Sequence, residues 1–253
     1  MTADGYLAAI LQREAIDTGL FSPVRTVQAT LQSVIQQWAG NRLAGVTPSG
    51  SFAKGTGNRS GTDIDLFISL APDTTETLKA IYESLFTKMT QAGYSPKRQN
   101  VSINIRVGGY DVDLVPAKRQ GYFGDDHSLY RRKADTLTKT NVTTHITCVR
   151  QAGSINETRI LKLWRNQKRL DLPSFYLELT TIEALRGQWS GTLSDNVWKV
   201  LVYLRDAFPN ARVVDPANTN NIISDDLTNA DRAKIKTAAA LALQAKTWGD
   251  IVK

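Results

Sequence analysis

The sequence has 253 residues, of which 42% are hydrophobic and 22% charged, and these are the proportions of a globular protein with a sizeable core. The formal net charge of +7 favours a polyanionic ligand, although a basic surface also serves solubility. The single cysteine, Cys148, excludes an intramolecular disulfide and a cysteine-rich zinc site. No run approaches the ~20 apolar residues that cross a bilayer, and the N-terminus lacks a signal-peptide pattern. We therefore expect a cytoplasmic protein without membrane contact.

Two helices are expected first, over residues 6–20 and 25–43. The second carries an apolar stripe at helical spacing, which is typical of a packing face rather than of a chemical site. The stripe consists of Val27, Leu31, Val34, Ile35 and Trp38.

A small-residue loop follows, in which Gly50 and Ser51 come after a proline and precede Phe52-Ala53-Lys54, where we expect a short helix to start. Such a turn offers free backbone N–H groups, a hydroxyl and the positive end of a helix dipole. These groups predict a cradle for an anionic phosphate.

The next strand, residues 63–68, carries two carboxylates. Side chains alternate along a strand, so Asp63 and Asp65 share one face while Ile64 and Leu66 enter the core. Two neighbouring carboxylates repel each other unless a cation lies between them. The strand therefore predicts a hard-metal site beside the phosphate loop.

A helix over residues 75–92 is followed by a hairpin. Residues 101–107 alternate as a strand, Gly108-Gly109 favours a two-residue turn, and residues 110–116 return as a second strand. We expect this return strand beside the one that bears Asp63. It carries two further carboxylates on one face, Asp111 and Asp113.

Residues 117–145 are polar and basic, with interspersed aromatic residues, and are expected to be irregular. Basic and aromatic side chains can hold phosphates and stack on bases, but a solvated connection fits equally well. The rest of the chain is expected to be helical over residues 156–170, 175–188, 194–207 and 226–248. Between the last two helices, residues 213–221 predict a turn in which Asx side chains bond their own backbone.

The arrangement of Gly50-Ser51 twelve positions before Asp63-Ile64-Asp65, with Asp113-Leu114-Val115-Pro116 later, resembles the DNA polymerase β-like nucleotidyltransferases. It is most similar to 2′-5′ oligoadenylate synthases, archaeal CCA-adding enzymes and bacterial cGAS-like (CD-NTase) enzymes. The resemblance also touches residues 159–180 and 213–221. It implies an α+β fold with a mixed-sheet catalytic lobe, a helical lobe, and the nucleotide in the cleft between them. The lobes would be residues 1–145 and 146–253, with N-terminal helices able to span both.

The resemblance also implies the site residues. Asp63, Asp65 and Asp113 would be the catalytic carboxylates and would bind two Mg²⁺ or Mn²⁺ ions, with Asp111 as the competing choice for the third. The implied nucleotide-binding residues are Gly50, Ser51 and Lys54 in the phosphate loop, Lys162 and Ser174 at the triphosphate, and Tyr176 at the base.

Three functions follow from this resemblance. The first is synthesis of a cyclic or linear oligonucleotide signal from nucleoside triphosphates in antiphage defence, with a downstream effector binding the product. The second is template-independent addition of nucleotides to an RNA, DNA or protein hydroxyl. The third is a catalytically silent nucleotide-binding module. The intact Gly-Ser pair and the three aspartates argue against the silent module.

Overall fold

The computed structural model describes residues 2–61 and 63–253, so Met1 and Thr62 are left out of the description. The chain forms two compact units. The sheet unit comprises Asp17–Lys54 and Thr62–Ile146, and the helical unit comprises Met1–Ile16, Gly55–Gly61 and Thr147–Lys253. No helix among the described residues is long and apolar enough to cross a membrane.

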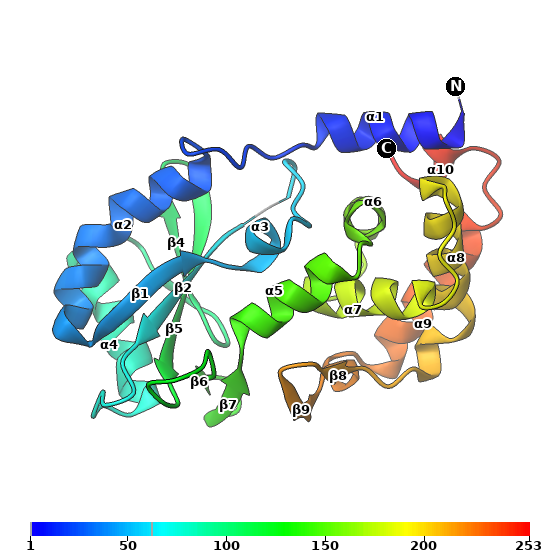
Figure 1. Ribbon diagram of the computed structural model, residues 1–253. Helices are drawn as coiled ribbons and strands as arrows, with labels where there is room; N and C mark the ends of the chain where they lie inside the picture. The colour runs from blue at the N-terminus through cyan, green and yellow to red at the C-terminus, as the bar shows by residue number, and fades with distance from the viewer. Residues whose placement is uncertain (1, 62) are drawn as a thin grey trace. The chain divides into compact units, whose positions relative to one another are not determined.

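The sheet unit is built on a mixed sheet whose strands run in the order β1-β2-β5-β4-β3 (Figure 1). β2 and β5 are neighbours, as predicted, and run parallel, while the other pairings on this path are antiparallel. The strands on this path are β1 (Leu43–Pro48), β2 (Ile64–Leu70), β3 (Lys97–Arg98), β4 (Ile103–Val107) and β5 (Tyr110–Arg119).

Two helices, α2 (Pro23–Ala39) and α4 (Leu78–Gln91), cover one face of this sheet. Their apolar stripes pack on the alternate residues of the strands, so that Leu66 and Leu114 are fully buried in the core of the unit. Because strand side chains alternate, the aspartates between these core residues must face the other side. Because α2 and α4 cover one face of the sheet, the candidate active site can form only on the opposite face.

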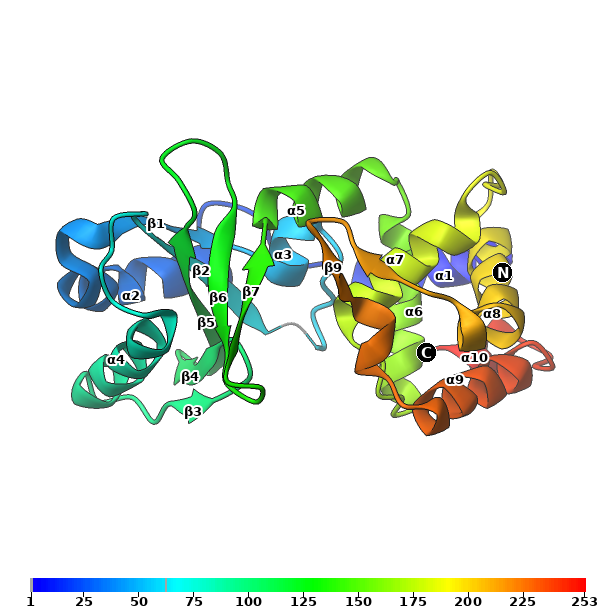
Figure 2. The ribbon, with the colours of Figure 1, turned by 90° about the horizontal axis from the view of Figure 1, so that it is seen from below.

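The prediction that residues 117–145 are irregular was wrong. β5 extends to Arg119, and the chain then forms an antiparallel pair of strands, β6 (His127–Arg131) and β7 (Thr136–Thr140). Figure 2 shows β6 lying between β5 and β7. The pattern was hidden because β7 is almost wholly polar, and only a few residues of the pair, such as Leu129 and Tyr130, are buried.

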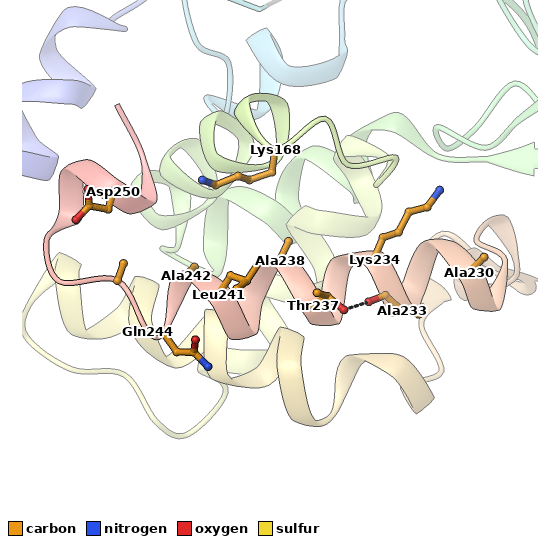
Figure 3. A pocket seen from close by; sticks show the side chains of 11 residues that line it. Lys168, Ala230, Ala233, Lys234, Thr237, Ala238, Leu241, Ala242, Gln244 and Asp250 are labelled. Carbon is orange, nitrogen blue, oxygen red and sulfur yellow. Dashed lines mark hydrogen bonds between the residues drawn. The ribbon is translucent and has the colours of Figure 1, made fainter.

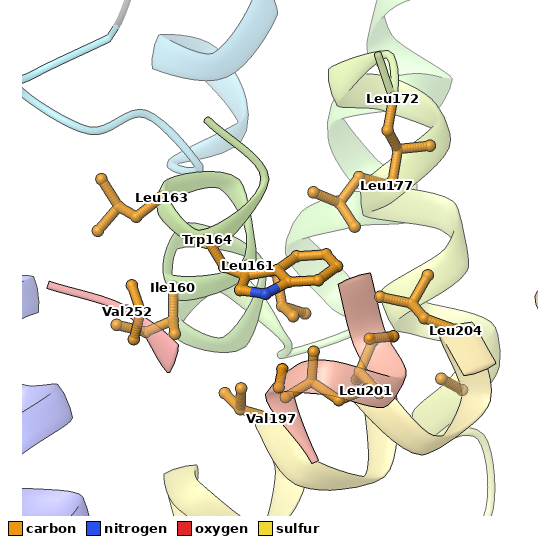
Figure 4. Close-up of a cluster of buried hydrophobic side chains, with 14 of the residues drawn as sticks. Ile160, Leu161, Leu163, Trp164, Leu172, Leu177, Val197, Leu201, Leu204 and Val252 are labelled. Carbon is orange, nitrogen blue, oxygen red and sulfur yellow. The ribbon is translucent and has the colours of Figure 1, made fainter. Parts of the chain in front are cut away.

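The helical unit is an array of helices around its own apolar core. The indole of Trp164 lies among side chains from α6, α7 and α8 (Figure 4), and it is almost completely buried. The helices of this unit are α1 (Ala3–Arg13), α6 (Ile155–Gln167), α7 (Ser174–Leu185), α8 (Leu193–Asp206), α9 (Asn229–Ala242) and α10 (Trp248–Ile251). α5 (Val142–Gln151) contains the division between the two units.

Two predicted helices have different bounds in the structure. The first ends at Arg13 rather than Leu20. The last is interrupted after Ala242, and a separate short helix starts after Thr247, whose side chain and that of Asp250 form a capping box. The predicted Asx turn is confirmed within a small hairpin of β8 (Val214–Asp215) and β9 (Asn218–Ile222), where the Asp215 carboxylate accepts from the Ala217 N–H at 2.8 Å.

Candidate active site

The predicted carboxylates lie on adjacent strands of the sheet unit. Asp65 of β2 and Asp113 of β5 are directly opposite each other in the parallel register. Asp63 comes just before β2 and two positions before Asp65, and like charge from Asp113 and Asp111 acts on its carboxylate. On the other side of β5, Asn104 of β4 faces Asp113 and donates an amide hydrogen bond to its carboxylate at 2.9 Å. Sheet register, rather than sequence proximity, therefore brings Asp113 to the Asp-x-Asp strand.

Burial, and after it like charge, raises the pKa values of Asp63 and Asp113. Desolvation raises the pKa of Asp63, and the negative charges of Asp113 and Asp111 raise it further. Burial also raises the pKa of Asp113, while hydrogen bonds from Asn104 and Ser102 oppose that rise. These raised pKa values show that the charged form of the carboxylates is disfavoured in the protein without a ligand. A bound cation would favour the charged form.

Asp111 shares the face of Asp113 but is two positions nearer the Gly108-Gly109 turn and is exposed. The residue opposite Asp65 in the register is Asp113, and Asp113 has the supporting hydrogen bond from Asn104. These two observations favour Asp113 over Asp111 as the third catalytic carboxylate, an assignment that stays a prediction.

The phosphate loop packs directly on the Asp65 strand. The Ser49 N–H donates to the Asp65 carbonyl at 2.8 Å. Gly50 has a φ of +56°, and a Cβ added there would lie 1.7 Å from the Asp65 carboxylate, so only glycine fits this position. α3 (Gly50–Lys54) begins here, with Ser51 half-buried in its first turn and Lys54 buried at its end. Three of the predicted nucleotide-binding residues therefore belong to one short helix beside a predicted catalytic aspartate.

Lys162, predicted at the triphosphate, is buried in the helical unit with an exposed fraction of only 5%. Its ammonium donates to the Glu178 carboxylate at 2.6 Å and to the Thr56 hydroxyl at 2.9 Å. The Thr56 hydroxyl in turn donates to Glu178 at 2.6 Å. A buried ion pair is stable when both charges are hydrogen-bonded, and this set of three residues provides those bonds. A role at the triphosphate would come in addition to this pairing.

Ser174 is the first residue of α7 and is exposed, and its hydroxyl accepts a hydrogen bond from Arg165 at 3.0 Å. Tyr176 has no exposed surface, because its ring packs against Phe208 at a centroid distance of 5.2 Å in the helical core. Its hydroxyl makes no hydrogen bond within the described residues. A contact between Tyr176 and a base would require the ring to leave this core. The base contact stays a prediction, and the buried position of the ring does not support it.

Sequence reasoning did not assign roles to Asn104, Thr56, Arg159 and Glu178. Asn104 could have been found, because it is one of two polar residues that alternate with apolar residues in β4, on the face opposite the core. Glu178 also carried a signal, since an acidic residue within the apolar run of α7 needs a buried partner. Thr56 and Arg159 had no local signal, because their contacts join residues about a hundred positions apart in the sequence.

The residues present suit a hard divalent cation, since carboxylate oxygens are the ligands that Mg²⁺ and Mn²⁺ prefer. The raised pKa of Asp63 fits such a site. Within residues 2–61 and 63–253, however, no three His, Cys, Asp or Glu side chains are arranged to hold a metal ion. The assignment of Asp63, Asp65 and Asp113 as metal ligands therefore remains a prediction.

The helical unit also has a hollow of about 860 Å³ along α9, shown in Figure 3. It is lined mainly by alanine and leucine side chains of α9, with Lys168, Lys234 and Asp250 at its edges. It contains none of the predicted site residues, so it is not part of the candidate active site.

No family model matches the sequence. One curated relative is the cyclic AMP-AMP-AMP synthase of Escherichia coli strain MS 115-1, which is 23% identical over 175 residues, or 64% of this chain. The chain spans about half of that relative, since the match covers 54% of its length.

Solved structures of low sequence identity share the fold over nearly the whole chain. The CdnC protein of E. coli MS115-1, in complex with HORMA-deltaN, has a TM-score of 0.79 at 19% identity, with 96% of this chain and 90% of that chain covered. The GTP complex of the CD-NTase CdnG of Bradyrhizobium diazoefficiens has a TM-score of 0.75 at 16% identity, covering 96% and 91%. The Cid1 poly(U) polymerase with Mg and 3′-dATP has a TM-score of 0.70 at 12% identity, covering 97% and 95%. The expected fold is thus confirmed: the chain has the α+β fold that CD-NTases share with poly(U) polymerases.

Proposed function

We propose that this chain is a metal-dependent nucleotidyltransferase, and that it joins nucleoside triphosphates into a cyclic or linear oligonucleotide signal. One observation carries the proposal. Asp65 and Asp113 are register neighbours on parallel strands, Asp63 comes two positions before Asp65, and the Gly50 backbone packs against Asp65. These contacts, in a fold shared with CD-NTases, support a site formed by the phosphate loop and the three aspartates.

The reaction is the attack of a hydroxyl oxygen on the α-phosphorus of a triphosphate. A new P–O bond forms, the bond to the β-phosphate breaks, and pyrophosphate leaves while the hydroxyl proton passes to a base. In the proposed mechanism the α3 N-terminus and the Ser51 hydroxyl bind phosphate oxygens, and the carboxylates of Asp63, Asp65 and Asp113 fix the reacting groups in line. Asn104 holds the Asp113 carboxylate in one orientation through its 2.9 Å hydrogen bond.

Mg²⁺ or Mn²⁺, expected as two ions, would lower the pKa of the attacking hydroxyl and neutralise the triphosphate charge. Asp63, Asp65 and Asp113 would be their protein ligands. The raised pKa of Asp63, caused by desolvation and by the charges of Asp113 and Asp111, supports this choice because a cation would lower it.

The proposed substrates are nucleoside triphosphates, by analogy with relatives whose structures contain ATP or GTP. Through the likeness to the cyclic AMP-AMP-AMP synthase, we propose an oligonucleotide product that an effector binds in antiphage defence. Because CdnC forms a complex with a HORMA protein, a protein partner that regulates synthesis belongs to the same proposal.

A second candidate function is terminal nucleotide addition to an RNA, DNA or protein hydroxyl. The fold similarity to the Cid1 poly(U) polymerase is the observation that favours it. The two functions use the same carboxylates and differ in the acceptor, which is a second nucleotide in one case and a polymer end or a protein in the other.

The experiment that tests the proposal is incubation of the purified protein with each labelled NTP and dNTP and with Mg²⁺ or Mn²⁺. Products are separated by size and treated with phosphatase. Small oligonucleotides from NTPs alone, some of them phosphatase-resistant if cyclic, support signal synthesis. Products only after addition of an RNA, DNA or protein acceptor support terminal transfer. Absence of any product under all these conditions, with nucleotide binding retained, would indicate the silent module.

A further inference from the structure

Between the phosphate loop and the Asp63-Asp65 strand lies a segment without helix or strand, residues 55–61, here called the connecting segment. Gly55 follows α3 directly, and Gly61 comes two residues before Asp63. Although its sequence neighbours belong to the sheet unit, the connecting segment belongs to the helical unit. The chain therefore leaves the sheet unit between two predicted parts of the active site and re-enters it afterwards.

The connecting segment is held by buried polar contacts rather than by secondary structure. The exposed fractions of Thr56 and Asn58 are 0% and 4%. Three of its seven residues are glycines, so the free segment would sample many backbone conformations, and fixing it must be offset by specific contacts.

Arg159 of α6 provides most of these contacts. Its Nε donates to the Gly57 carbonyl at 3.1 Å and to Asn58 Oδ1 at 3.2 Å. Its Nη2 donates to the Leu11 and Glu14 carbonyls at 3.1 and 2.9 Å, and its own carbonyl accepts from Asn58 Nδ2 at 2.9 Å. A single guanidinium thus joins the connecting segment to the C-terminal end of α1. It can do so because a guanidinium has several N–H donors in a rigid planar group, which a lysine ammonium lacks.

Other bonds fix the two ends of the connecting segment. Near its beginning, the Thr56 hydroxyl joins the buried pair of Lys162 and Glu178. Near its end, the Arg59 N–H donates to the Glu14 carbonyl at 3.1 Å and the Ser60 N–H to the Glu14 carboxylate at 2.9 Å. Arg159 contacts the middle of the segment, at the Gly57 carbonyl and the Asn58 side chain.

We propose that Arg159 is a positioning residue for nucleotidyl transfer. By fixing the connecting segment, Arg159 limits the positions that Gly50-Ser51 on one side and Asp63 on the other can adopt, and this keeps the phosphate loop and the first catalytic carboxylate in reacting geometry. The inference rests on the proposed function. A purely structural role for Arg159, as a stabilising bond within the helical unit, is the alternative that the experiment must exclude.

The experiment compares Arg159→Ala with a matched control, Arg42→Ala. Arg42 is also half-buried and also donates to two backbone carbonyls, those of Trp38 and Ala39. It pairs with the Glu76 carboxylate as well, and among the described residues none of its hydrogen bonds reaches the connecting segment. For each protein we would measure thermal unfolding, hydrogen exchange of residues 55–61, binding of a non-hydrolysable ATP analogue with Mg²⁺, and kcat and KM. Arg159→Lys serves as the conservative variant.

We expect Arg159→Ala to speed exchange in residues 55–61 and to lower kcat roughly tenfold to a hundredfold, since small misplacements of reacting groups have effects of that size. Arg159→Lys should be intermediate, because it keeps the charge but not the fork. Arg42→Ala should lower the unfolding temperature without changing exchange in the segment or kcat. Wild-type kcat in an Arg159→Ala protein with faster exchange would overturn the proposal, and so would equal losses of kcat in both alanine variants.

If Arg159→Ala does not fold, Asn58→Ala carries the same expectations, because it removes the partner side of the contact. Failure of the proposed function would be recognised differently, by a wild-type protein that forms no product from any triphosphate. In that case binding of the ATP analogue decides: weaker binding in Arg159→Ala than in Arg42→Ala supports a positioning role, and equal binding overturns it.

Discussion

The two units of the protein differ in how their buried or partly buried charges are arranged. In the sheet unit, Asp65 and Asp113 lie opposite each other on neighbouring strands, and desolvation and like charge raise the pKa of Asp63. In the helical unit, Lys162 and Glu178 are buried but carry opposite charges and share the Thr56 hydroxyl. The charges of the helical pair are opposite and bonded to each other, whereas the aspartates carry like charges, and we propose that a cation binds between them. A cluster of like-charged carboxylates therefore indicates a functional site, whereas a buried pair of opposite charges indicates a structural role.

The largest expected effect comes from the aspartate cluster. Asp63→Asn and Asp65→Asn should each lower nucleotidyl transfer by roughly three orders of magnitude or more while leaving the fold intact, because each removes a predicted metal ligand. Circular dichroism measures whether the fold is retained, and a product assay measures the loss of nucleotidyl transfer. Asp17→Asn is the matched control, since asparagine can still accept the hydrogen bond from the Gly19 N–H. Near-normal turnover in either site variant would contradict the assignment.

The second prediction separates the two candidates for the third carboxylate. Asp113→Ala should abolish transfer while binding of the triphosphate with Mg²⁺ partly survives, whereas Asp111→Ala should have a mild effect. The physical reason is that Asp113 lies opposite Asp65 and is oriented by Asn104, while Asp111 is exposed. A side-by-side kcat measurement tests the ranking. The reverse ranking would move the site two residues toward the turn.

The third prediction tests whether the buried pair also has a ligand role. Lys162→Ala should lower the free energy of unfolding by about 3–5 kcal/mol, because it leaves the Glu178 carboxylate buried without its cation. If Lys162 also binds the triphosphate tail, the variant should lose ~1–3 kcal/mol of ATP binding and much less of AMP binding.

Chemical denaturation measures the first part, and titration of ATP, ADP and AMP measures the second. Ser174→Ala should reduce ATP binding in the same direction but less, since its hydroxyl is a neutral group. Equal losses for all three nucleotides in Lys162→Ala would limit Lys162 to the structural pair.

The smallest effect concerns pH. The pKa of Asp63 is raised above 3.8 in the folded protein, so the folded state binds its proton more tightly than the unfolded state does. The stability that this proton contributes is present below the unfolded pKa and is lost as the pH rises through the folded pKa. Asp63→Asn should therefore gain stability relative to the wild type on going from about pH 3 to about pH 7. Urea unfolding of both proteins at the two pH values measures this, and a relative loss for the variant would contradict the account.

Much of the fold and of the carboxylate cluster could be predicted because the signals were local. The alternation around Asp65 and around Asp113, together with the turn at Gly108-Gly109, correctly predicted the strands and their pairing. The β6–β7 pair was missed because its strands are short and β7 is polar, so their pairing depends on tertiary contacts.

The contacts of Lys162 and Arg159 could not be predicted for a related reason. Both residues join α6 to the connecting segment about a hundred residues earlier in the sequence. The periodicity of either segment alone does not indicate that the two segments contact each other. Lys162 was recognised only through its resemblance to a nucleotide-binding helix. The position of Glu178 in an apolar run indicated that it needs a buried partner, but the structure was needed to identify that partner as Lys162.

The central claim is most directly tested by measuring pyrophosphate release from each NTP with Mg²⁺, for the wild type and for Asp65→Asn. Nucleotidyl transfer releases one pyrophosphate for each bond formed, whereas simple hydrolysis of the terminal phosphate releases orthophosphate. We expect pyrophosphate from the wild type, matched by incorporation of labelled nucleotide into product, and almost none from Asp65→Asn. Release of orthophosphate alone, or equal pyrophosphate release by both proteins, would contradict the central claim.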